Sequence, residues 1–301
     1  MYDNDSKGIS YLAGFFMLIV FVIAGLALAA TLRDQIWIQM TGKGLDELEK
    51  GMSDPTHSDA IKIIQSLTTV LGFFVPSIVT AFLLNRRPFT LLGFSSAGIR
   101  LSQIGLVILL IGASLFVATS LSHITNNLPL PQGWRIQFNK MEEVYNQQVS
   151  AIINLKSVSD YILALIIMAF LPAVCEETLF RGGLQNFLTR GTGWPWLSIV
   201  IVSALFSLVH FSGYGFLSRL FLGVVLGAMF YYSGKLWLSI LAHFINNALA
   251  ITLLYMSIQQ GKPIQEAMKQ DANTFWGIVA VPVVIVLFVA FKRVSTSKRL
   301  T

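Results

Sequence analysis

The sequence has few residues that could form cross-links or a charged surface. Its 301 residues include a single cysteine, Cys175, which excludes an internal disulfide and any metal cluster built from several cysteines. Only 12% of the residues are charged, whereas soluble domains average about 25%. The net charge is +6, but the basic residues form no patch interleaved with aromatic side chains, as nucleic-acid-binding surfaces do. These shortages argue against a soluble domain and against a nucleic-acid-binding protein.

Long apolar runs are what the chain has in abundance. Hydrophobic residues make up 54% of it, and its mean hydropathy is +0.68. A membrane-spanning helix needs about 20 mostly apolar residues, and the first run is longer than the apolar core of a signal peptide. We therefore predict an all-α, polytopic membrane protein with about eight transmembrane helices, at residues 9–31, 61–84, 101–124, 159–187, 195–211, 215–233, 236–257 and 274–291.

Basic residues gather at the ends of these runs, as topology determinants do. With about eight spans they all fall on one side of the membrane, which predicts that both termini are cytoplasmic. In the loop over residues 125–158, we expect the part from Met141 to Ile153 to form a short helix at the membrane interface. The basic residues that carry the topology prediction are Lys7, Arg86, Arg87, Arg100, Arg190, Lys235, Lys292, Arg293, Lys298 and Arg299.

Two adjacent acids and an arginine, Glu176, Glu177 and Arg181, interrupt the fourth run. Ionisable groups at membrane depth are costly, so they indicate a functional site. Glu177 and Arg181 are four residues apart, share a helix face and are expected to pair. Glu176 points about 100° away from Glu177 and is left as a candidate general base. The alternative is that both acids mark the cytoplasmic end of the helix, with Arg181 extending to the interface. Gly182 and Gly183 would let another helix approach closely.

Polar residues on later helices offer partners at a similar depth. Phe206 and His210 share one face of the fifth predicted helix, and His243 and Asn247 share one face of the seventh. At 1.5 Å per residue these positions lie about 12–22 Å from the cytoplasmic side, and Glu176 lies about 18 Å deep. A lone histidine on an apolar helix is more often a packing residue. The whole set, however, predicts a buried polar site among helices 4, 5 and 7.

The same residues form three ordered motifs, Glu176-Glu177-x-x-x-Arg181, Phe206-x-x-x-His210 and His243-x-x-x-Asn247. On successive apolar helices this set resembles the CPBP family, which includes the CAAX prenyl endopeptidases and the bacteriocin-processing and immunity-type membrane proteases. The resemblance covers roughly residues 160–257. We expect one membrane-embedded domain over residues 1–301, with a catalytic core at about 159–257 and with helices 1–3 and 8 at its periphery.

The resemblance implies an intramembrane protease, that is, a peptide hydrolase. Glu176 and His210 would activate a water for attack on a peptide carbonyl, and His243 and Asn247 would stabilise the oxyanion. Glu177, Arg181 and Phe206 would support these four residues. The family has been described both as metal-dependent and as metal-free glutamate proteases. Glu176, His210 and His243 would form the zinc set if a metal is used. Because no His-Glu-x-x-His helix is present, we expect no cofactor to be required.

The expected partners are the lipid bilayer and a protein or peptide substrate that is membrane-associated or lipid-modified, with no nucleic acid. The expected location is a membrane that the chain crosses several times, the cell membrane if the protein is bacterial. One alternative function is a non-enzymatic membrane transporter or scaffold, whose buried polar cluster binds an ion or a partner. Transporters often have paired halves with interrupted helices, and the sequence has no visible pairing of this kind.

Overall fold

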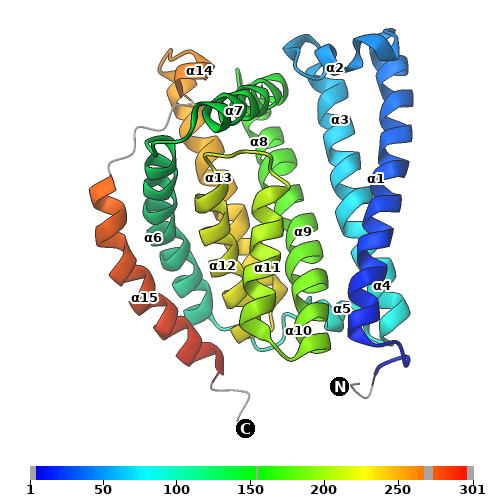
Figure 1. Ribbon diagram of the computed structural model, residues 1–301, viewed down its shortest axis with the longest axis vertical. Helices are drawn as coiled ribbons and strands as arrows, with labels where there is room; N and C mark the ends of the chain where they lie inside the picture. Colours follow the sequence, from blue (N-terminus) through cyan, green and yellow to red (C-terminus); the bar gives the residue numbers. More distant parts are fainter. Residues whose placement is uncertain (1–4, 154, 268–273, 297–301) are drawn as a thin grey trace.

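The computed structural model is a bundle of roughly parallel helices, with one long helix lying across one end (Figure 1). The structure describes residues 5–153, 155–267 and 274–296, and those residues contain helices and no strand. Seven helices of this part of the chain are long and apolar enough to cross a membrane. They are α1 Tyr11–Thr41, the segment Pro55–Leu84 (η2, α3, η3 and α4), α6 Leu101–Asn126, the segment Val158–Thr192 (α8 to α10), α12 Phe216–Ser233, α13 Leu236–Gln259 and α15, over Thr274–Ser295. The predicted all-α membrane fold is confirmed.

The fifth predicted span is shorter than expected. Helix α11 covers Pro195–Leu208, only 14 residues, instead of 195–211. The chain leaves the helix at Val209 and reverses at Phe211, whose φ of 46° lies in the left-handed region that a bulky residue seldom adopts. His210 therefore lies in a turn at the end of a short helix. An apolar run on its own gives no sign of this early end, because the residues that follow Leu208 remain largely apolar.

Two of the spans contain wide helical turns, and in each span one such turn ends two residues before a proline. A third wide turn, η5 Thr178–Gln185, has no proline in it or directly after it. The π-helical segment η3, Val70–Phe74, precedes Pro76 within α4 Val75–Leu84, and the π-helical segment η4, Leu165–Phe170, precedes Pro172 within α9 Leu171–Glu177. Proline has no N–H, and its ring clashes with the carbonyl four residues earlier, so a regular helical turn cannot form at that point. The wider turn accommodates the ring while the span continues.

The expected interfacial helix is present and is longer than predicted. Helix α7 covers Gln132–Ile152, against the predicted 141–153, and lies across the end of the bundle opposite the chain ends (Figure 1). The remaining short elements are η1 Leu45–Glu47, α2 Leu48–Gly51, η2 Pro55–His57, α3 Ser58–Thr69, α5 Pro88–Leu91, α8 Val158–Ala164, η5 Thr178–Gln185, α10 Asn186–Thr192 and α14 Ile264–Ala267.

The basic residues of the topology prediction lie towards one face of the bundle. Helix α1 begins and α15 ends at this face, where α5 and α10 also lie (Figure 1). Arg86 and Arg87 directly precede α5, and Arg190 is in α10. The loop that holds Lys235 joins the same face, because the Leu236 N–H donates to the Gly93 carbonyl at 2.8 Å. Lys298 and Arg299 lie outside the described residues.

Apolar packing on both sides encloses the segment that carries the two acids. On one side, Leu18 and Leu84 of α1 and α4 pack against Phe180 and Phe187. On the other side, α6 and α15 pack against α12 and α13. The close approach predicted at the paired glycines is observed: a Cβ added to Gly183 would lie 2.6 Å from Leu18 Cδ2. The acids are thereby surrounded by hydrocarbon and by neighbouring helices.

We predict that Gly25→Ala lowers the thermal unfolding temperature in detergent. A Cβ at Gly25 would overlap the backbone carbonyl oxygen of Leu71 in η3, and a backbone atom cannot move aside as a side chain can. Overpacking of this kind costs about 1–3 kcal/mol. Gly112→Ala is the matched control, because nothing lies within 4 Å of its added Cβ. Equal unfolding temperatures for the two variants would contradict the close α1–η3 contact.

Candidate active site

The site begins with an ion pair that is completely removed from solvent. Arg181 Nη1 donates to Glu177 Oε1 at 2.7 Å, and both side chains are 0% exposed. Arg181 Nη2 also donates to the Gly223 carbonyl at 3.2 Å, which joins η5 to α12. The predicted pair therefore forms inside the bundle. Arg181 does not extend to the membrane interface, so the alternative that it merely marks the end of the helix does not hold.

Glu177 has a second partner that the spacing of the motifs did not predict. Its Oε1 lies 2.8 Å from His243 Nδ1 of α13, and the His243 side chain is 6% exposed. An ionised carboxylate only accepts hydrogen bonds, so the His243 hydrogen is on Nδ1. In the neutral ring the Nε2 lone pair then points away from Glu177. One carboxylate thus orients both an arginine and a histidine.

Glu176 faces the two histidines without touching either of them. Its Oε2 lies 3.9 Å from His243 Nε2 and 4.0 Å from His210 Nε2, beyond hydrogen-bond reach. The same oxygen is buried and has no hydrogen-bond partner among the described residues. Two groups that share one water lie about 4–4.5 Å apart. The arrangement therefore suits a small molecule held between Glu176 and the histidines.

His210 is oriented by the backbone of its own helix. Its Nδ1 lies 2.7 Å from the Phe206 carbonyl, which can only accept, so the hydrogen is again on Nδ1 and the neutral ring presents its Nε2 lone pair. The Phe206 ring packs against both histidine rings, with centroid distances of 4.8 Å to His210 and 5.8 Å to His243. The Arg181 guanidinium lies over the same ring at 4.7 Å. Phe206 thus contacts both histidines and the cation of the ion pair.

Asn247 is one turn beyond His243 on α13, as predicted, and contacts its neighbour. Within the described residues its side chain makes one hydrogen bond, in which Asn246 Nδ2 donates to Asn247 Oδ1 at 2.9 Å. Of the four predicted catalytic residues, the structure brings Glu176, His210 and His243 into one group. The Asn247 amide nitrogen has no acceptor among the described residues.

One further cation, Arg219 of α12, lies near this group and was not among the predicted site residues. Its guanidinium interacts electrostatically with both Glu176 and His210. The signal was available: Arg219 is an arginine near the start of the sixth apolar run, with no acidic residue on the same helix.

The site does not have the spacing of a zinc centre. Within the described part of the chain, no three His, Cys, Asp or Glu side chains are arranged so that they could hold a metal ion. Ligands of a tetrahedral zinc lie about 3.3 Å from one another, whereas Glu176 lies 3.9 and 4.0 Å from the histidine nitrogens. The donor types suit zinc, and the separations in this structure are wider than those of a tetrahedral zinc site.

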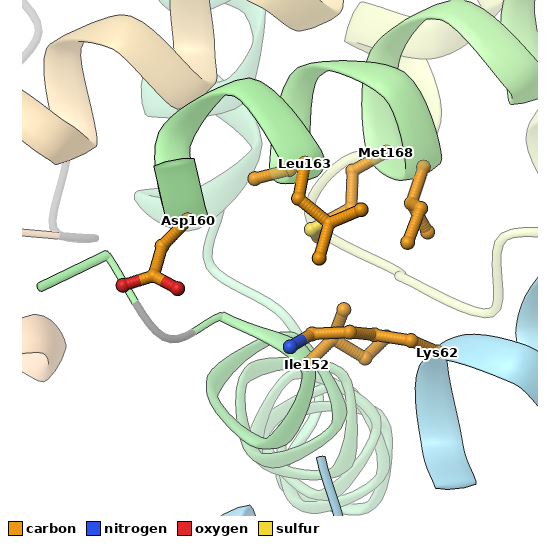
Figure 2. Close-up of a pocket in the computed structure, with 7 residues that line it drawn as sticks. Lys62, Ile152, Asp160, Leu163 and Met168 are labelled. Atoms are coloured by element: carbon orange, nitrogen blue, oxygen red, sulfur yellow. The ribbon is translucent and has the colours of Figure 1, made fainter. Parts of the chain in front are cut away.

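A small hollow elsewhere in the molecule has no part in this site. Figure 2 shows it between α3, the end of α7 and the α8–η4 part of the fourth span, with Lys62 and Asp160 among the residues that line it. Its volume is about 10 Å³, roughly the space that one water molecule needs. None of the predicted site residues lines it, so it is not a binding site for a peptide.

We predict that Arg181→Met lowers the free energy of unfolding by about 3–5 kcal/mol, because it leaves the Glu177 charge buried without its cation. The double variant Glu177→Gln/Arg181→Met, in which neither charge is buried, should recover much of that loss. Arg135→Met on the exposed side of α7 is the control and should change stability by no more than about 0.5 kcal/mol. Thermal unfolding in detergent measures all three, and a double variant no more stable than the single one would contradict the ion-pair interpretation.

The comparisons with known proteins agree with the resemblance seen in the motifs. No curated protein and no solved structure matches the chain. Residues 158–249 match a family model described as Rce1-like, type II CAAX prenyl endopeptidase. The matched segment includes Glu176, His210, His243 and Asn247. The match confirms the predicted family resemblance over this segment, which is similar to the Rce1-like CAAX proteases, and at the level of that family it supports a membrane endopeptidase.

Proposed function

We propose that this protein cleaves peptide bonds within the membrane by means of a water activated by Glu176 and His210. The observation that carries the proposal is the position of the Glu176 carboxylate, which faces the Nε2 atoms of His210 and His243 at 4.0 and 3.9 Å. Three polar groups from three segments of the chain converge there at separations that one water can bridge. An arrangement of this kind is costly in an apolar bundle unless it serves chemistry.

The reaction begins with a water held between Glu176 and His210. The water donates one hydrogen bond to His210 Nε2, whose lone pair is free in the neutral tautomer, and one to the Glu176 carboxylate. As the water oxygen attacks the carbonyl carbon, Glu176 accepts the proton. When the C–N bond breaks, Glu176 returns that proton to the leaving amine. Glu176 thus serves first as general base and then as general acid.

The oxyanion formed by this attack requires hydrogen-bond donors, and we assign that role to His243 and Asn247. The amide nitrogen of Asn247 is a donor with no acceptor in the described structure. His243 already directs its Nδ1 hydrogen to Glu177. For Nε2 to donate as well, the ring must carry both hydrogens, a cationic form with which Glu177 can pair. Donors fixed in a dry site stabilise an oxyanion more effectively than water does.

We propose that the reaction needs no metal. The separations at Glu176 match a shared water better than a tetrahedral zinc, and the proton transfers above use only side chains of this chain. Glu176, His210 and His243 remain the residues on which zinc would have to bind if this proposal is wrong.

We infer that the substrate is a peptide or protein presented from the membrane or from its cytoplasmic face. The basic residues near α5, α10 and the end of α15 support a cytoplasmic position for that face by the positive-inside rule, and with it the prediction that both termini are cytoplasmic. If the protein is bacterial, its membrane is the cell membrane. A transporter or scaffold is the alternative function, and it would use the same polar cluster without hydrolysis.

The first test is Glu176→Gln, which keeps the size and hydrogen bonding of the side chain and removes the base. We expect cleavage in detergent, measured by mass spectrometry on a peptide library, to fall by at least about 10²–10⁴-fold, the usual contribution of a general base. Glu143→Gln on exposed α7 is the control and should cleave at the wild-type rate. Unchanged cleavage by Glu176→Gln would refute the mechanism.

The second test removes metals. We expect the cleavage rate to survive exhaustive treatment with a zinc chelator followed by removal of the chelator, because no step uses a metal. Addition of zinc should not raise the rate. Loss of activity that zinc restores would overturn the metal-free mechanism and would leave the peptidase assignment intact.

A further inference from the structure

Arg219 is a cation near the site that makes no ion pair at contact distance with any described carboxylate. Its Nη1 is buried and makes no hydrogen bond among the described residues. No carboxylate of that part of the chain lies within ion-pair distance of it, in contrast to Arg181, which has Glu177 at 2.7 Å. A buried donor on a charged group that lacks an acceptor costs more than any other unpaired hydrogen-bonding group. The site therefore contains a guanidinium that no carboxylate of the described residues contacts directly.

The surroundings of Arg219 hold the guanidinium in place without neutralising it. Its central carbon lies 5.2 Å from the centre of the Tyr145 ring of α7, which covers one face of the planar group. On another side the guanidinium packs against Gly215, where an added Cβ would overlap Nη1. A ring stacked on the face leaves the in-plane N–H donors available. These are the donors that bind a carboxylate through two parallel hydrogen bonds.

Glu142 of α7 forms a hydrogen bond with the turn that follows His210. Glu142 Oε2 accepts from Ser212 Oγ at 2.9 Å, and this bond ties α7 to the turn that follows His210. The same Ser212 oxygen accepts from the Gly215 N–H at 3.1 Å. The turn from His210 to Gly215 thus connects the catalytic histidine to the residue against which Arg219 packs. An anion on Arg219 would lie beside the reacting groups.

We propose that Arg219 is a substrate-binding residue, which binds a carboxylate of the peptide close to the bond that is cleaved. This inference rests on the proposed function. The carboxylate approaches in the plane of the guanidinium, while the Tyr145 ring stays on its face, and accepts charge-assisted hydrogen bonds there. Two sources have this chemistry, the C-terminus of a peptide and an Asp or Glu side chain. In either case Arg219 selects the peptide and sets which of its bonds reaches Glu176.

The first experiment compares peptides that differ only in one charge. From a peptide that the wild-type protein cleaves, matched analogues replace the C-terminal acid by an amide or each nearby Asp or Glu by Asn or Gln. One such replacement should lower the wild-type kcat/KM about tenfold or more, because a hydrogen bond to a charged group is lost. The analogue that shows the loss identifies the source of the carboxylate.

The same peptides are then given to Arg219→Gln and Arg219→Glu. In Arg219→Gln the preference for the acid over its amide should disappear, and in Arg219→Glu a lysine at the sensitive position should become preferred. A residue that only attaches α7 through Tyr145 would lower cleavage of every analogue equally, and that result overturns the proposal. Arg135→Gln on α7 is the control and should keep the wild-type preference. These comparisons need only residual cleavage, so they are independent of the Glu176→Gln test.

A binding measurement decides the inference even if no cleaved peptide is found. The probes are acetyl-Ala-Ala with a free carboxylate, acetyl-Asp-amide, and acetyl-Ala-Ala-amide as the neutral control. At millimolar concentration, at least one of the two acids should raise the unfolding temperature of the wild-type protein and leave Arg219→Gln unchanged. Equal shifts by acid and neutral amide, no shift by either acid, or an acid-dependent shift retained in Arg219→Gln, would overturn the role of Arg219 without bearing on hydrolysis.

Discussion

The site depends on one buried carboxylate, Glu177, which pairs with Arg181 and with His243 at the same time. A charge in the apolar interior is strongly unfavourable unless it is paired and hydrogen-bonded. Glu177 meets this requirement only when the segment after α9 lies against both α12 and α13. The pairing therefore joins three parts of the chain and directs His243 Nε2 towards Glu176. The need to pair the buried Glu177 charge therefore fixes the orientation of His243.

The backbone supplies what this pairing cannot. Helix α11 ends at Leu208, and the left-handed conformation of Phe211 turns the chain directly after His210. His210 thereby reaches Glu176 from the end of a helix, where its Nδ1 can bond to the Phe206 carbonyl. The turn is then held by Ser212 against α7. The same short helix that departs from the predicted span length places the second histidine at the site.

The family comparison and the geometry support one another at different levels. The matched segment, residues 158–249, contains the three motifs. In the bundle, the Nε2 atoms of His210 and His243 lie 4.0 and 3.9 Å from Glu176 Oε2. The mechanism, the role of Asn247 and the absence of a metal remain proposals. Arg219 belongs to this segment but to none of the motifs. In the proposal made above, it is the residue that selects the peptide.

The sequence by itself determined the membrane class, the all-α fold, the resemblance to the CAAX protease family and the pairing of Glu177 with Arg181. The membrane class, the fold and the ion pair follow from apolar run length or from spacing along one helix, which are local properties. The resemblance follows from the order of three such local motifs along the chain. Only the tertiary structure decided that Glu177 also orients His243 and that α11 ends at Leu208, just before His210. It also decided that Arg219 lies near the site with a buried Nη1 that has no hydrogen-bond partner among the described residues. Contacts between distant helices depend on packing across the bundle, and no spacing within a single helix encodes them.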